Sequence, residues 1–236
     1  MRLLTLSLDA LAALRDATEG SQPDLAAAAT LGELVGADFV RLGVTEEMRP
    51  VREADVRAVR GAAAALELRM APVPALVKVA LETQPERLLL ASEGRKGRVT
   101  SGPLDFRAWG AALPPVVRTL HEAGLQVAVR ISPDLESVKA AHAADLTAVE
   151  FFTGALIDLP EAERRAGLER LTDATRLAAK LRLSVGIGGG LGIRDLATVL
   201  AAAPAVQGVA VGRSLISRAL LVGLDRAVRD FRERLG

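Results

Sequence analysis

The sequence predicts an α/β fold in which short strands alternate with amphipathic helices, and three observations favour it. Eight short apolar runs recur along the chain, each followed by a stretch with helical period. No Gly/Ser-rich linker interrupts the alternation, so residues 1–236 are expected to form one domain. Half of the residues are apolar, which is enough to bury a sizeable core. Together these features predict a single closed (β/α)8 TIM barrel, and a doubly wound open sheet is the competing architecture.

Each expected strand is a short apolar run. In chain order the strands are "RLLTLSL" (2–8), "DFVRLGV" (38–44), "LELRMA" (66–71), "RLLLA" (87–91), "QVAVRI" (126–131), "AVEFF" (148–152), "LSVGIG" (183–188) and "GVAVG" (208–212). The expected helices lie near residues 24–35, 52–65, 73–83, 105–123, 135–143, 161–181, 193–202 and 214–235. Fragments such as "GAD" and "EAGL" fit helix ends that enter the next strand. In a barrel the chemistry lies in the loops that follow the strands, so these loops contain the candidate residues.

Composition excludes several classes of function. Thirty Lys and Arg are matched by 29 Asp and Glu, which argues against a nucleic-acid partner. No apolar run is long enough to span a membrane and no signal-peptide pattern is present, so a cytoplasmic location is expected. The chain has no Cys, and its two His residues are His121 and His142. Disulfides and thiol chemistry are therefore excluded, and neither a metal site nor a cofactor is expected.

A cluster of glycines follows the seventh strand. The turn at Gly188, Gly189 and Gly190 has no side chains, so its N–H groups can approach an anion closely. The segment after the eighth strand adds Gly212, Arg213 and Ser214 at the start of the last helix. These two turns of a barrel frequently bind phosphate, and a tight turn without a ligand is the alternative. A dinucleotide fingerprint is not favoured, because Leu191 occupies its last glycine position counted from Gly186.

Fragments along the whole chain resemble one family. They are "LSLDALAALRDA", "QPDL", "GADFV", "LRMA", "LETQPERLLL", "LDF", "HEAGLQVAVRI", "VEFFTG", "VGIGGGLG" and "VGRSLISRALLVGL". In order and spacing the chain resembles pyridoxine 5'-phosphate synthase, the barrel enzyme of vitamin B6 biosynthesis. That family condenses deoxyxylulose phosphate with an amino-oxopropyl phosphate. The resemblance implies a homo-oligomer.

The resemblance also implies site residues. Asp9 matches the aspartate of the family's first-strand motif, although Ser7 stands where the family has Asn. Glu150 matches the glutamate of the sixth strand, and Thr100 a threonine that contacts substrate. The glycines at 188, 190 and 212 match the phosphate-binding turns. The loop from 92 to 102 corresponds to one that closes over substrate, and its Arg95, Lys96 and Arg98 either contact phosphate or form a solvated turn.

The reactive side chains of the family are absent. Gly43 replaces the catalytic histidine of the second strand, Arg69 replaces a catalytic glutamate, and Gly189 replaces the histidine of a G-H-G turn. Arg213 replaces another histidine, while Thr18 and Thr45 replace arginines. The condensation needs several proton transfers, for which histidine is well suited. Whether the chain is an enzyme therefore stays open.

Glu150 is the one remaining candidate for an acid or base at a strand end. Arg69 and Arg130 either line an anion pocket with Glu150 and Asp9, or Arg69 pairs with Glu150 while Arg130 points to solvent. His121 and His142 are expected on helices, in surface or packing roles, and Trp109 in packing or an oligomer contact.

The sequence predicts a barrel that binds a phosphorylated small molecule, either a B6 vitamer or a sugar phosphate, without the condensation. The alternative is an active pyridoxine 5'-phosphate synthase, or another phosphate-ester enzyme that uses Glu150. A third possibility is a structural protein that keeps the barrel only for its surface.

Overall fold

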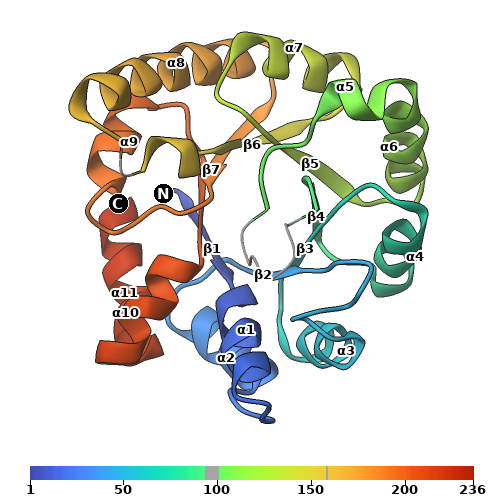
Figure 1. The fold of residues 1–236 in the computed structure, drawn as a ribbon, viewed down its shortest axis with the longest axis vertical. Coiled ribbons are helices and arrows are strands. Elements are labelled where there is room, and N and C mark those ends of the chain that lie inside the picture. The colour runs from blue at the N-terminus through green and yellow to red at the C-terminus, as the bar shows by residue number, and fades with distance from the viewer. Residues whose placement is uncertain (94–100, 158) are drawn as a thin grey trace.

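The computed structural model is a closed barrel of eight parallel strands, joined in chain order, in which β8 pairs with β1 (Figure 1). It describes residues 1–93, 101–157 and 159–236. The strands are β1 (Leu3–Ser7), β2 (Phe39–Gly43), β3 (Leu66–Met70), β4 (Arg87–Leu90), β5 (Gln126–Ile131), β6 (Ala148–Phe152), β7 (Ser184–Gly188) and β8 (Gly208–Val211). Each lies within its predicted range, and the predicted closed barrel is confirmed.

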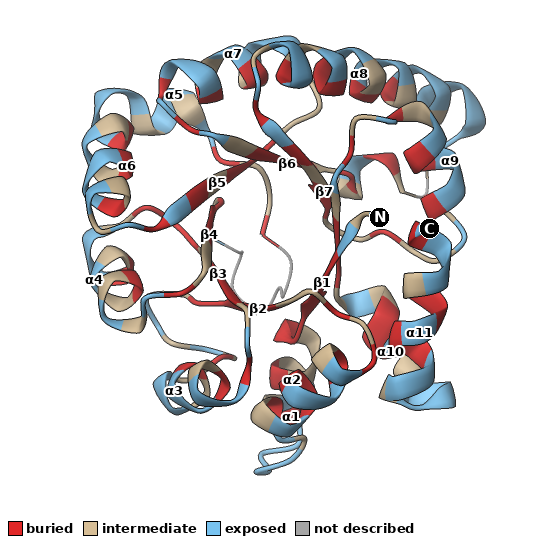
Figure 2. Cartoon of the chain, turned by 180° about the vertical axis from the view of Figure 1, so that it is seen from behind, coloured by how far each residue is buried: buried red, intermediate tan, exposed pale blue. Residues whose placement is uncertain are grey.

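Helices surround the barrel. They are α1 (Asp9–Ala17), α2 (Leu25–Leu34), α3 (Glu53–Ala62), α4 (Pro74–Thr83), α5 (Phe106–Trp109), α6 (Leu113–Glu122), α7 (Leu135–Ala143), α8 (Glu161–Lys180), α9 (Leu196–Ala202), α10 (Arg213–Val222) and α11 (Leu224–Leu235). Figure 2 shows their buried residues on the side that faces the strands. Among the described residues, no helix is long and apolar enough to cross a membrane.

Three of the expected helices differ from the prediction for reasons that lie in the local structure. The segment expected as one helix over 105–123 is divided into α5 and α6 after Trp109, where Gly110 has a φ of 45°. The segment expected as one helix over 214–235 is broken by Gly223, whose φ of 85° does not continue a helix, into α10 and α11. The helix expected from residue 193 begins at Leu196, because the Asp195 carboxylate accepts a hydrogen bond from the Gly192 N–H and holds a turn there.

Helix α1 is additional to the expected set, and it places Asp9 beside the end of β1. Trp109 is the last residue of α5 and packs against the core, which agrees with the packing role expected for it.

The two faces of each strand are buried in different surroundings. Leu6, Leu42 and Leu68 are fully buried and belong to the hydrophobic core. The alternate residues point into the barrel. There β2, β3 and β4 contribute Arg41, Glu67 and Arg87, and β5 and β6 contribute Arg130 and Glu150. The remaining inward positions of β5 to β8 include the small residues Ala128, Ala148, Gly186, Gly208 and Ala210. The barrel interior therefore holds a polar network beside a sparsely filled part.

Candidate phosphate site at the barrel mouth

The glycine turn after β7 has a backbone that only glycine adopts easily. Gly189 and Gly190 have φ values of 92° and 99°, in the left-handed region. A Cβ atom at Gly189 would overlap the Phe152 ring. The turn therefore leaves no room for a side chain at position 189.

The amide groups of this turn point to no internal acceptor. Across the described part of the chain, no group accepts a hydrogen bond from the N–H groups of Gly189, Gly190 or Gly212. Gly212 caps α10 without a side-chain hydrogen bond, so the first N–H groups of that helix are also open. The two turns thus present the unpaired donors that an anion requires.

Arg213 brings a positive charge to the same place. A Cβ atom at Gly190 would lie 3.7 Å from Arg213 Nη2, so the exposed guanidinium stands over the turn. Ser214 has a different role from the predicted one. Its hydroxyl donates a hydrogen bond to the carbonyl of Leu191. This bond joins the two turns, and the hydroxyl proton is therefore not available to a ligand.

A small cleft joins these turns to the barrel interior. It is lined by Ser7, Asp9, Ala10, Arg41, Arg69, Arg130, Gly189, Gly190, Ala210, Val211, Gly212 and Arg213. Seven predicted site residues therefore meet there, namely Ser7, Asp9, Arg69, Gly189, Gly190, Gly212 and Arg213. Gly188 and Glu150 lie beside the cleft and do not line it, and the Gly188 carbonyl accepts hydrogen bonds from Thr153. Thr100, Arg95, Lys96 and Arg98 lie outside the described residues.

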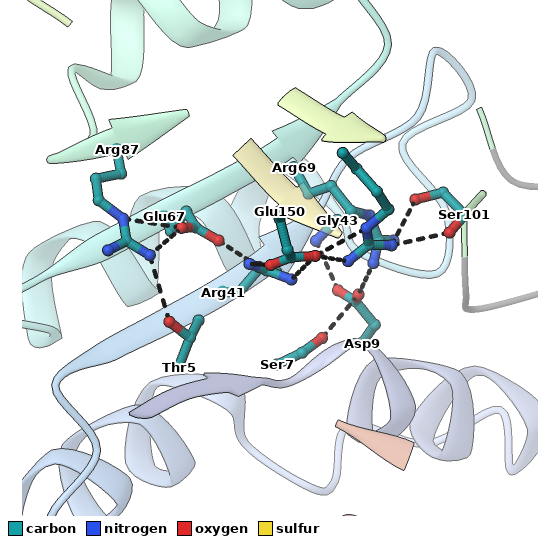
Figure 3. Close-up of polar contacts among 11 residues, drawn as sticks. Thr5, Ser7, Asp9, Arg41, Gly43, Glu67, Arg69, Arg87, Ser101 and Glu150 are labelled. Carbon is teal, nitrogen blue, oxygen red and sulfur yellow. Dashed lines mark hydrogen bonds and ion pairs between the residues drawn. The ribbon is translucent and has the colours of Figure 1, made fainter. Parts of the chain in front are cut away.

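Asp9 organises one wall of the cleft (Figure 3). Its carboxylate accepts hydrogen bonds from the Gly43 N–H at 2.6 Å and the Ser7 hydroxyl at 2.9 Å, and pairs with Arg69 Nη1 at 3.0 Å. A Cβ atom at Gly43 would overlap the Arg69 guanidinium. Gly43 and Arg69 are therefore sterically linked, because Arg69 fills the space over Gly43.

Glu150 lies deeper, between two arginines. Arg130 donates to Glu150 Oε1 from Nε at 2.8 Å and from Nη2 at 2.6 Å, and Arg41 pairs with both oxygens from the opposite side of the barrel. Arg130 is 2% exposed and also donates to the Ser101 carbonyl at 2.8 Å. The alternative in which Arg69 pairs with Glu150 and Arg130 points to solvent is wrong, because Arg69 pairs with Asp9.

These pairs set the protonation of the site. Burial alone would raise the pKa of Glu150, but the charges and hydrogen bonds of Arg41 and Arg130 outweigh it and lower the pKa to about 2. Burial, together with the neighbouring charges of Arg69 and Arg41, lowers the pKa of Arg130 to about 10. Glu150 is thus a carboxylate that positions arginines, and its geometry does not favour the predicted role as acid or base near neutral pH.

The ion-pair network continues to the other end of the barrel through residues that the sequence analysis missed. Arg41 Nε pairs with Glu67, and Arg87 donates to Glu67 Oε2 at 2.9 and 2.5 Å. The pKa of the Glu67 carboxyl is lowered, because the charges of Arg41 and Arg87 outweigh its burial. These residues could have been found in the sequence as charged residues in the middle of apolar strands, as in "FVRLG" and "LELRM". A charged side chain in such a position is rarely buried without a partner.

Both histidines lie away from this site. His121 and His142 are in the last turns of α6 and α7, which lead into the starts of β5 and β6. In a barrel these strand starts lie at the end opposite the mouth. The expectation that the histidines lie on helices is confirmed.

Known proteins are similar in sequence to this chain over nearly its whole length. The family described as "Pyridoxal phosphate biosynthesis protein PdxJ" matches residues 4–236. The pyridoxine 5'-phosphate synthase of Syntrophotalea carbinolica is 37% identical and the matched region covers 100% of this chain and 99% of that protein. The corresponding protein of Pelobacter propionicus is 34% identical over 99% and 98% of the two chains.

Solved structures share the fold at low sequence identity. Thiamine phosphate pyrophosphorylase from Pyrococcus furiosus superposes with a TM-score of 0.61 at 15% identity, over 99% of this chain and 94% of that one. Phosphoribosylanthranilate isomerase from Thermotoga maritima has a TM-score of 0.62 at 12% identity, over 99% and 98%. These likenesses support the barrel, while the full-length relatives and the family match decide the family: the chain belongs to the PdxJ family of pyridoxal phosphate biosynthesis proteins.

Proposed function

We propose that the chain binds the phosphate group of a small phosphate ester at the barrel mouth, and that it does not perform the condensation of its relatives. The observation that carries the proposal is one cleft that is lined by Gly189, Gly190, Gly212 and Arg213, in which the N–H groups of the three glycines have no acceptor among the described residues. Backbone donors at a helix N-terminus, next to a cation, are a recurrent way to bind phosphate.

The charges around the cleft match a phosphate monoester. The cleft is lined by the cations Arg41, Arg69, Arg130 and Arg213 and by the carboxylate Asp9, and the Glu150 carboxylate pairs with two of these arginines. Four positive charges against two negative ones leave two positive charges in excess. A phosphate monoester carries roughly −1.5 to −2 near pH 7, so one such group neutralises the site.

The proposed loss of condensation rests on the residues at three positions and on the ion pairs of Glu150 with Arg41 and Arg130. Gly43, Arg69 and Gly189 supply no group that titrates near neutral pH, and Glu150 is held as a carboxylate between two arginines. Proton transfer needs groups whose pKa lies near the working pH. The names of the relatives favour a B6 vitamer or a related sugar phosphate as the ligand.

Calorimetry tests the proposal directly. Pyridoxine phosphate, pyridoxal phosphate and inorganic phosphate are titrated into the wild-type protein and into Gly190→Asp, which places a carboxylate in the turn. We expect saturable binding of at least one phosphate compound, and a loss of more than tenfold in affinity in the variant. The absence of saturable heat with all three compounds would refute the proposal.

The alternative function is an active pyridoxine 5'-phosphate synthase, or another phosphate-ester enzyme that uses Glu150. The identity of 34–37% over the full length of the relatives favours this alternative. A bacterial strain that cannot make vitamin B6 separates the two. Growth restored by the wild type and lost with Glu150→Gln would establish an active enzyme, whereas no growth supports binding alone.

The family resemblance also supports a homo-oligomer, and the surface exposes several large apolar side chains. Leu221 is 87% exposed and Leu220 67% exposed on α10, and Leu34 at the end of α2 is 77% exposed. Light scattering on the wild type and on Leu221→Lys tests the patch. We expect a multimer in the first sample and a smaller species in the second, and an unchanged mass would exclude this surface.

A further inference from the structure

A second cavity opens at the end of the barrel opposite the candidate phosphate site. It has a volume of about 330 Å³ and is lined by the first residues of the strands, among them Leu3, Phe39 and Gly208. Small-molecule sites in proteins begin at roughly 300 Å³ and combine apolar walls with a few fixed polar groups. Most barrels fill this space with large side chains.

The cavity exists because one half of the barrel carries small inward residues. Ala128, Ala148, Gly186, Gly208 and Ala210 form its wall on β5 to β8. A Cβ atom at Gly186 would have its nearest neighbours at 3.6 Å, so the backbone does not demand glycine there. The space is thus left open by the choice of side chains and not by strain in the strand.

Arg87 stands on the opposite wall in a fixed position. Its Nε and Nη2 atoms donate to Glu67, Nη2 also reaches Thr5 Oγ1 at 3.4 Å, and the guanidinium lies 3.9 Å from the centre of the Phe39 ring. Its side chain is 26% exposed while that of Glu67 is 2% exposed. The arginine is therefore both rigid and accessible from the cavity.

One nitrogen of Arg87 remains available. Within the described residues no group accepts a hydrogen bond from Nη1, and Figure 3 shows one guanidinium nitrogen of Arg87 without a dashed contact. The carboxylates that also line the cavity already pair with arginines: Glu67 with Arg41 and Arg87, and Glu150 with Arg41 and Arg130. Within the described residues, the cavity therefore presents no carboxylate without an arginine partner.

We propose that this cavity binds a small organic monocarboxylate, whose carboxylate pairs with Arg87 Nη1 and whose apolar body lies against Ala128, Ala148 and Gly186. Arg87 Nη1 is a charged donor without an acceptor among the described residues, and carboxylates pair strongly with guanidinium groups. The small residues provide an apolar surface that a hydrated inorganic ion would not use. The site is separate from the glycine turns, so the inference stands whether or not the mouth binds phosphate.

Benzoate is a suitable probe, with benzamide as its neutral counterpart of nearly the same shape. In calorimetry and thermal unfolding we expect saturable binding of benzoate and a higher melting temperature, and no comparable response to benzamide. Arg87→Gln should weaken benzoate binding at least tenfold. Equal responses to benzoate and benzamide, or no saturable benzoate binding by the wild type, would overturn the proposal.

Two further variants keep the test decisive. Ala148→Leu fills the cavity without touching the contacts of Arg87, so it should also weaken benzoate binding at least tenfold while circular dichroism shows an intact fold. Arg60→Gln is the matched control, because Arg60 pairs with Glu86 at 3.0 Å on the outside of the barrel at 36% exposure. Benzoate binding that survives Ala148→Leu, or that is lost in Arg60→Gln, contradicts the assignment.

Discussion

The two ends of the barrel present polar groups in different ways. At the mouth, Gly189, Gly190 and Gly212 line a cleft with exposed Arg213, and their N–H groups have no acceptor among the described residues. At the opposite end, a cavity is bounded by small side chains and by one immobilised arginine, Arg87.

The two ends share a wall of ion pairs. Its guanidinium groups from Arg41 and Arg130 line the mouth, while the carboxylates of Glu67 and Glu150 line the cavity. The difference teaches that one network borders both ends. The carboxylates on its cavity side are already paired with arginines, so the integrity of the network matters to both ends.

The largest effect should come from breaking this shared wall. Glu150→Ala leaves Arg41 and Arg130 buried without their common partner, which typically costs about 3–5 kcal/mol in the free energy of unfolding. Urea denaturation measures the loss. Glu136→Ala, which removes an exposed pair with Lys139, is the control and should cost less than about 1 kcal/mol. Similar losses in both variants would mean that the wall is not a stabilising unit.

Acid should weaken the same wall. The pKa of Glu150 falls from 4.5 to about 2 on folding, because the attraction of Arg41 and Arg130 outweighs burial. Its contribution, on the order of 3 kcal/mol, is present above pH 4.5 and is lost as the pH falls toward 2. Unfolding free energies between pH 7 and pH 2 should therefore decline less steeply in Glu150→Gln than in the wild type. Parallel curves would contradict the assignment.

A smaller loss should follow from restoring a side chain at the mouth. Gly43→His forces an imidazole into the space of the Arg69 guanidinium, and overpacking of this kind costs about 1–3 kcal/mol. Adding Arg69→Ala should recover part of the loss, because it vacates that space. A double-mutant cycle by denaturation measures the coupling. Independent, additive losses would show that the two positions do not compete.

The smallest expected effect concerns Arg213. Removing its exposed charge by Arg213→Gln should weaken phosphate-ester binding about tenfold, since a hydrogen bond to a charged group contributes about 1.5 kcal/mol. Benzoate binding at the opposite end should not change. Arg165→Gln, an exposed arginine on α8, is the control. If Arg213→Gln and Arg165→Gln weaken binding equally, the ligand is attracted by the overall positive charge of the surface and not by a contact with Arg213 at the turn.

The fold was predictable because its signals are local. The eight strands lie within the predicted ranges, since a short apolar run followed by a helical period is readable in a window of the chain. The breaks at Gly223 and before Leu196 depend on backbone conformation and on one side-chain hydrogen bond, which composition alone does not determine.

Local sequence patterns predicted the candidate site only where its residues are adjacent in sequence. The family resemblance supplied the distant residues Asp9 and Arg69. The glycine turn after β7 stands out as "GIGGGLG". The pairing of Arg41 with Glu150 joins residues 109 positions apart across the barrel, and no local pattern specifies it. Arg130 was expected either in a pocket or in solvent, and its burial follows from that cross-barrel partner.

The steric link between Gly43 and Arg69 limits which side chains these two positions can hold together. In the present rotamer of Arg69, a Cβ atom at position 43 would overlap its guanidinium. A larger residue at position 43 therefore requires a different residue or rotamer at position 69. Because the guanidinium pairs with Asp9, such a change also removes an ion pair from that carboxylate, so the three positions are constrained as one unit.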